Sequence, residues 1–171
     1  MLGDEATPET TLVLGIGNIL LGDEGFGVHV ARGLKDIELP DNVRIEEGGV
    51  GGFNLLGLLE GVRRLVVVDV MMTDIPAGEL LLFKPGLDFT EPGKRIISFH
   101  QVGVIELVQM WGLLGYKPEL FFLVTRPEKM EWSMELSPPL CNAASKAIKL
   151  ITELCWNNFT GFERRQELCT Q

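Results

Sequence analysis

Residues 65–69 read LVVVD, a run of four apolar residues that ends on an acid. Four other short stretches have a similar strand-forming character: 11–15 (TLVLG), 43–47 (VRIEE), 80–83 (LLLF) and 120–124 (LFFLV). Short runs with little polar alternation are typical of strands that are buried on both faces of a sheet. We therefore expect these five stretches to be the strands of one sheet.

Helical patterns fill most of the intervals between these stretches. They cover 25–36 (GFGVHVARGLKD), 53–62, 102–114 and 139–154, the last with a proline at its start. Strands that alternate with helices predict an α/β fold with a mainly parallel sheet and helices on both of its faces.

The chain has 171 residues, which suits one globular domain. We expect this domain to span residues 1–155 and to be followed by a C-terminal tail, 156–171, that is partly mobile. Residues 84–99 are rich in proline, glycine and charge. They predict a long irregular connection, of the kind that tends to be functional in a compact domain.

The net charge is −9, which argues against nucleic acid as the main partner, because such partners are bound largely through basic surfaces. The acidic, polar start MLGDEATPET has no signal-peptide pattern. No apolar run approaches the roughly 18–20 residues of a membrane span. The interpretation is a cytoplasmic protein that acts on neither nucleic acid nor membrane.

Three acids follow strands and are candidates for chemistry. Asp69 ends the 65–69 stretch, and Asp23 and Glu24 lie in the glycine-bracketed sequence GDEGFG after the first strand. Ligands of doubly wound sheets bind beyond the carboxyl ends of the strands, which is where all three acids are expected. Each could equally cap local backbone amides, and one of the adjacent pair could cap the helix while the other faces a cleft.

The chain has two histidines. His29 lies within the first helical stretch, where a surface or packing role is the better interpretation, whereas His100 lies just before the helical stretch 102–114. A helix N-terminus disfavours the charged imidazolium and so favours the neutral form that binds metals. Glu24, Asp69 and His100 together would suit a divalent ion such as nickel or zinc and would leave coordination positions open.

Other chemistries have little support. The sequence GIGN at 15–18 lacks the third glycine of a dinucleotide fingerprint, because Leu20 stands there. No GxSxG elbow or Walker A loop is present. Cys141, Cys155 and Cys169 form no metal-ligand spacing and are interpreted as reduced thiols. Water chemistry assisted by acids or a metal remains.

The stretch LGIGNILLGDEGFGV at 14–28 resembles the N-terminal signature of the hydrogenase maturation proteases, which process the large subunit of nickel-iron hydrogenases. Further matches run through EGGVGG at 47–52, the strand at 65–69 and SFHQ at 98–101. The resemblance covers about residues 11–155. It implies a three-layer fold whose twisted, mainly parallel sheet has five strands.

The resemblance also implies a function and a site. The family's metal-contacting Glu, Asp and His fall on Glu24, Asp69 and His100. The implied substrate is a hydrogenase large-subunit precursor that already holds nickel and loses a short C-terminal extension. The sequence departs from the family around TRPE at 125–128, where Arg126 is a candidate substrate contact.

Several alternatives stay open at this point. Water could be activated by Asp23, Asp69 or Glu24, and a carboxylate that ligates nickel is a poorer base. A peptidyl-tRNA hydrolase-like enzyme shares the opening strand and GIGN, although the acidic charge disfavours it. A third hypothesis is a nickel-sensing chaperone that binds the precursor without cutting it.

Overall fold

The structure, a computed structural model, describes residues 10–50, 57–84, 109–160 and 162. Five strands form one sheet in the spatial order β2-β1-β3-β5-β4. Their bounds are β1 Thr10–Ile16, β2 Val43–Gly49, β3 Val62–Val70, β4 Leu80–Phe83 and β5 Glu119–Thr125. All five predicted strands are confirmed.

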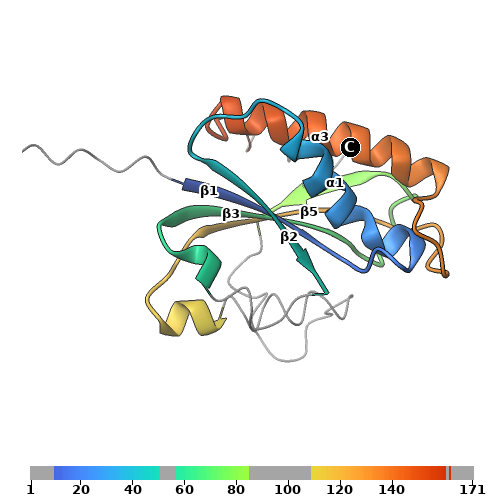
Figure 1. The fold of residues 1–171 in the computed structure, drawn as a ribbon, viewed down its shortest axis with the longest axis horizontal. Helices are drawn as coiled ribbons and strands as arrows, with labels where there is room; N and C mark the ends of the chain where they lie inside the picture. Colours follow the sequence, from blue (N-terminus) through green and yellow to red (C-terminus); the bar gives the residue numbers. More distant parts are fainter. Residues whose placement is uncertain (1–9, 51–56, 85–108, 161, 163–171) are drawn as a thin grey trace, which may run out of the picture.

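The sheet is mainly parallel, as expected. Strands β2, β1, β3 and β5 pair in parallel, and β4 pairs antiparallel with β5 at one edge. The carboxyl ends of the four parallel strands consequently meet at one edge of the sheet, which we call the carboxyl edge (Figure 1). This edge is where the sequence placed the candidate acids.

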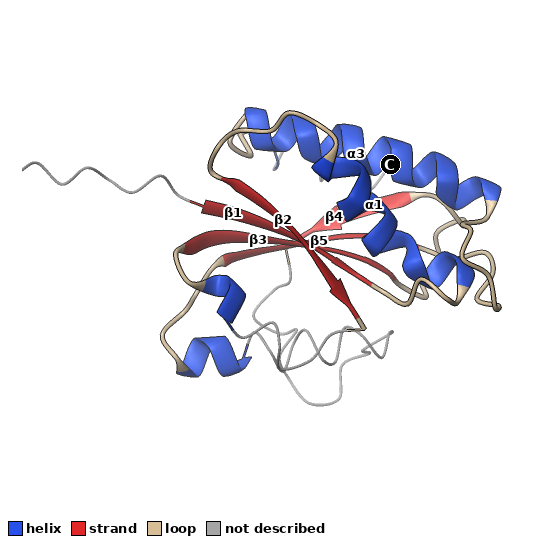
Figure 2. Ribbon diagram, viewed as in Figure 1, coloured by secondary structure: helices blue, strands red, loops and turns tan. Residues whose placement is uncertain are grey.

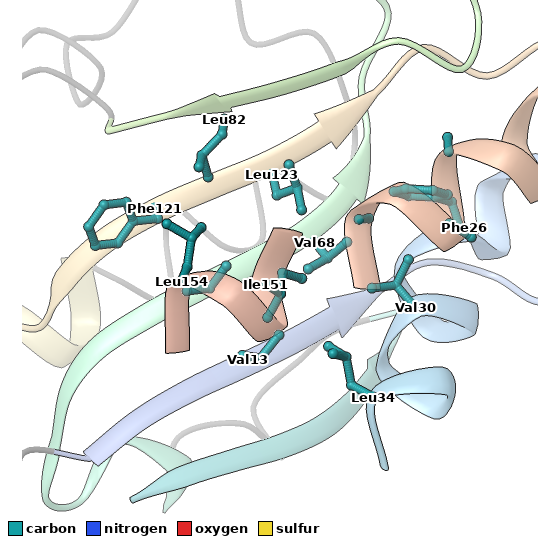
Figure 3. Close-up of a cluster of buried hydrophobic side chains, with 14 of the residues drawn as sticks. Val13, Phe26, Val30, Leu34, Val68, Leu82, Phe121, Leu123, Ile151 and Leu154 are labelled. Atoms are coloured by element: carbon teal, nitrogen blue, oxygen red, sulfur yellow. The ribbon is translucent and has the colours of Figure 1, made fainter. Parts of the chain in front are cut away.

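Helices α1 (Phe26–Lys35) and α3 (Pro138–Trp156) lie side by side on one face of the sheet (Figure 1). Figure 3 shows the core that they cover, where Val30 and Leu34 of α1 and Ile151 of α3 meet Val13 and Val68 of the sheet. Helical turns at 57–59 and 109–113 lie on the opposite face (Figure 2). Leu59 and Trp111 of these turns are buried in a cluster with Leu65 and Val67 of the sheet.

The predicted helix at 53–62 is corrected by the structure. Residues 57–59 form a single 3-10 turn, and Val62 begins β3. Gly61 separates them with a φ of 70°, a conformation that an α-helix does not contain. Residues 53–56 lie outside the described residues, as do 102–108 of the next predicted helix, of which 109–113 is helical.

The predicted boundary at residue 155 falls one residue before the end of α3. Beyond the helix, Phe159 and Phe162 are buried against Phe121, with ring centroids 4.9 and 4.8 Å from it. These two residues of the predicted tail therefore belong to the core. Residues 163–171 lie outside the described part of the chain. Residues 85–99 of the predicted irregular connection also lie outside it.

None of the helices among the described residues is long and apolar enough to cross a membrane. The cytoplasmic location stays a prediction.

Two glycines let α1 start directly on the sheet. A Cβ atom on Gly27 would lie 2.1 Å from the carbonyl oxygen of Val68 and 2.3 Å from that of Ile16. A Cβ atom on Gly15 would lie 2.1 Å from the carbonyl oxygen of Gly27. The N-terminus of α1 therefore rests on the backbone of β1 and β3 with no side chain between them.

We predict that Gly27→Ala lowers the free energy of unfolding by at least about 3 kcal/mol, because the backbone oxygens that the new methyl group meets cannot move aside. Urea unfolding monitored by circular dichroism measures the change. Gly112→Ala is the matched control, because a Cβ atom there meets nothing within 4 Å. Equal stability of Gly27→Ala and wild type would show that α1 does not need this contact.

Candidate active site at the carboxyl edge of the sheet

The loop after β1 is held against the sheet by a third glycine. Gly17 has a φ of 138°, and a Cβ atom on it would lie 1.8 Å from the carbonyl oxygen of Glu24. Gly17 also donates its N–H to the carbonyl of Gly49 at the end of β2, at 2.7 Å. The short 3-10 helix η1 (Gly22–Gly25) thus lies directly on Gly17, which fixes the position of Glu24.

Asp23 is fully buried, and its carboxylate accepts four hydrogen bonds. Oδ2 accepts the N–H groups of Glu128 and Lys129 and the hydroxyl of Ser137, each at 2.8 Å. Oδ1 accepts the N–H of Ser137 at 2.7 Å. With both oxygens engaged, Asp23 joins η1 to both ends of the loop that leads from β5 to α3. This geometry favours a positioning role for Asp23 over activation of water.

Asp69 is the second buried acid, and its carboxylate is only half satisfied. It lies near the end of β3, on the same face as Leu65 and Val67, because side chains alternate along a strand. Its Oδ1 accepts the N–H of Val70 at 2.8 Å, whereas its Oδ2 is buried without a partner among the described residues. A buried oxygen without a partner is costly unless a proton, a ligand or a metal satisfies it.

Burial, with a smaller contribution from the nearby charge of Glu24, raises the pKa of Asp69 to about 8 against the opposing hydrogen bond from Val70. A buried carboxyl group whose ionisation is disfavoured by a neighbouring carboxylate readily holds a proton. Such a pair can exchange that proton with a reacting group, or release it when a cation binds. The structure thus brings Glu24 and Asp69 together at the carboxyl edge.

His100 and residues 85–108 around it lie outside the described residues, so its predicted place beside the acids is untested. No group of three or more His, Cys, Asp or Glu side chains that could hold a metal occurs in the part of the chain that the structure describes. The pair of acids supplies at most two of the three predicted ligands from this part.

Three other residues that the sequence analysis considered, His29, Arg126 and Cys155, lie among the described residues. Burial and the charge of Arg32 lower the pKa of His29, against an opposing hydrogen bond to the backbone of Met134. Arg126 donates to the carbonyl of Ile75 at 3.5 Å, and its predicted contact with substrate is untested. Burial raises the pKa of the Cys155 thiol to about 11, which leaves it unsuited to act as a nucleophile.

A comparison with protein-family models matches residues 28–154 to the hydrogenase maturation protease family (HycI). The chain belongs to this family. Its members are peptidases, so the protein is a hydrolase, and the match favours the protease over the peptidyl-tRNA hydrolase-like alternative.

Individual relatives agree with this assignment. The hydrogenase expression/formation protein HupD of Bradyrhizobium diazoefficiens is 36% identical over 84% of this chain and 76% of its own. The hydrogenase 2 maturation protease of Escherichia coli is 35% identical over 74% of this chain and 79% of its own.

Solved structures of the family have the same fold. The hydrogenase maturating endopeptidase HybD from E. coli superposes with a TM-score of 0.74 at 29% identity, covering 83% of this chain and 89% of its own. HybD from Thermococcus kodakarensis gives a TM-score of 0.73 at 25% identity, over 85% and 99% of the two chains. The expected three-layer, five-stranded α/β architecture is that of the maturation proteases.

The sequence of this maturation protease did not reveal that Asp23 holds the β5–α3 loop in place. The four donors to Asp23 come from residues 105 to 114 positions further along the chain. The only signal in the sequence is the adjacency of two acids in GDE, which allows one of them to bind backbone groups while the other faces the site.

We predict that Asp23→Asn lowers the free energy of unfolding by about 2–4 kcal/mol, because an amide group cannot accept at both of its atoms and must turn its NH₂ towards one set of donors. Chemical denaturation measures the loss. Asp41→Asn, at an exposed acid, is the control and is expected to change the stability by less than about 0.5 kcal/mol. A loss no larger than that of the control would exclude the positioning role.

The raised pKa of Asp69 gives a second prediction, for the metal-free protein. At a pH between 3.8, the ordinary pKa of an aspartate, and about 8, the pKa of Asp69 in the folded protein, the folded state binds more protons than the unfolded state. This contribution to stability is therefore present at low pH and falls as the pH rises through that window, by up to about 1.4 kcal/mol per pH unit.

Asp69→Asn should remove this fall, whereas Asp36→Asn, at an exposed acid, should keep it. Urea unfolding across the window, with a chelator present, measures the difference. A parallel pH dependence in wild type and Asp69→Asn would contradict the raised pKa.

Proposed function

We propose that the protein is an endopeptidase that removes a C-terminal extension from the nickel-loaded precursor of a nickel-iron hydrogenase large subunit. Membership of the maturation protease family supports the reaction class. The observation that carries the proposal is the buried Oδ2 of Asp69 beside Glu24 at the carboxyl edge, which has no partner among the residues that the structure describes.

The nickel in this proposal belongs to the substrate. Asp69 and Glu24 offer carboxylate oxygens, and His100 is proposed as the third contact from its match to the family motif. Oxygen and imidazole ligands without a thiolate should hold free nickel only moderately. Nickel that the precursor already binds could gain these ligands at an open position, so cleavage would depend on loading of the substrate.

The same two acids are the proposed source of acid–base chemistry. A carboxyl group with a pKa near 8 is poised to give up or accept a proton close to neutral pH. Asp23 is the least suited of the three predicted acids to activate water, because its two oxygens already accept four hydrogen bonds. We therefore propose an aspartyl-type hydrolysis in which Glu24 and Asp69 divide the tasks of contacting nickel and activating water.

We predict that the wild-type protein shortens the nickel-loaded precursor and leaves the nickel-free precursor intact. Asp69→Asn should lower the rate at least about 100-fold, because an amide can neither transfer the proton nor replace the carboxylate as a ligand. Asp36→Asn is the control and should cleave as the wild type does. Intact-mass measurement of the precursor reads out the cleavage.

Two outcomes would contradict the proposal. Equal cleavage of both precursor forms would exclude recognition of nickel. Binding of the nickel-loaded precursor without any shortened product would instead favour the alternative of a nickel-sensing chaperone.

A further inference from the structure

Large apolar side chains are exposed along the carboxyl edge of the sheet. Each of the four parallel strands is followed by at least one: Val50 after β2, Leu20 after β1, Met72 after β3, and Met130, Trp132 and Met134 after β5. We call these six residues the apolar rim. They are six of the ten exposed large apolar side chains among the described residues, so exposure of this kind is concentrated at the edge that carries Glu24 and Asp69.

Trp132 is the most exposed member of the apolar rim. Trp132 is 82% exposed, and Met130 and Met134 on either side of it are 53% and 60% exposed. Single exposed apolar residues are ordinary, but contiguous groups mark interaction surfaces. Tryptophan and methionine are also enriched where proteins bind one another, and tryptophan is frequent among the residues that dominate binding energy.

The loop that carries Trp132 is held in place by backbone hydrogen bonds. Ser133, next to Trp132, donates its N–H to the carbonyl of Leu20 at 3.1 Å and accepts the N–H of Gly22 at 2.7 Å. The two ends of the loop are held by Asp23, as described above. The exposed side chains therefore stand on a backbone that is ordered before binding, which reduces the entropy lost on association.

The same hydrogen bonds tie the apolar rim to the candidate active site. Leu20 lies in the connection that leads into η1, Gly22 is the first residue of η1, and Glu24 is two residues further along. A protein that contacts Trp132 thus touches a loop bonded directly to the segment that positions Glu24. Contacts here would set the position of a bound protein relative to the acid pair.

We propose that the apolar rim is the docking surface for the folded precursor whose extension is removed, with Trp132 as its main anchor. The inference rests on the proposed function and adds the surface by which the substrate is recognised. Exposed Glu128, Glu131 and Glu135 border the rim with a single cation among them, Lys129. The complementary patch on the precursor is therefore an apolar centre bordered by lysine or arginine.

The test compares Trp132→Ala with the wild type on the nickel-loaded precursor. KM for the precursor should rise at least about tenfold, because a central anchor is lost, while kcat changes by less than about threefold, because no group at the acid pair is altered. The thermal midpoint should not change, since the side chain packs on almost nothing.

Trp156→Ala is the matched control. Trp156 is also exposed, at 57%, but it lies at the far end of α3, a helix of 19 residues and so about 28 Å long. KM should be unchanged in this variant. An unchanged KM in Trp132→Ala, or an equal rise in both variants, would overturn the proposal.

Binding measured without cleavage separates this proposal from the proposed function. Isothermal titration of wild type and Trp132→Ala with the nickel-loaded precursor should show the same loss of affinity whether or not a shortened product forms. Equal affinities would overturn the docking surface even if cleavage occurs. Self-association of the wild type that Trp132→Ala abolishes, together with unchanged precursor affinity, would assign the rim to a second copy of the chain and also overturn it.

Discussion

The direct contact between the start of α1 and the backbone of β1 and β3 is the constraint on which the rest of the site depends. Gly15 and Gly27 allow it, because neither position has room for a Cβ atom. With α1 held there, the preceding 3-10 helix η1 lies directly against Gly17. Glu24 is consequently placed at the carboxyl edge, near the end of β3.

The two adjacent acids of η1 then have opposite surroundings. Asp23 turns inwards and binds both ends of the β5–α3 loop, whereas Glu24 lies near enough to Asp69 to raise its pKa. One acid therefore supports the architecture and its neighbour contributes to the chemistry. The loop that Asp23 holds also carries Trp132, so one carboxylate links the acid pair to the proposed docking surface.

Much of the fold could be predicted from the sequence because the strands are continuous apolar runs, which local composition reveals. The stretch at 65–69 is the clearest case. The position of Asp69 after its four apolar residues also predicted that this acid lies at the carboxyl edge, and Asp69 pairs with Val124 near the ends of β3 and β5. The helix predicted at 53–62 was wrong at its end, because apolar spacing alone did not show that Gly61 adopts a positive φ and that β3 starts at Val62.

The site could be predicted only in part. Glu24 and Asp69 follow strands, and that position was enough to single them out. The role of Asp23 could not be predicted from the sequence, because its hydrogen-bond donors lie more than a hundred residues further along the chain. Most of them are backbone N–H groups, which no sequence pattern identifies. The exposure of Trp132 was equally hidden, since the sequence alone does not distinguish a buried apolar loop residue from an exposed one.

The central claim is that Asp69 is held protonated near neutral pH by its burial and by Glu24. An NMR titration of its carboxyl carbon in the metal-free protein tests this claim most directly. The account predicts a pKa of about 8 in the wild type and a lower value in Glu24→Gln. A pKa near the ordinary value of 3.8 in both proteins would contradict it.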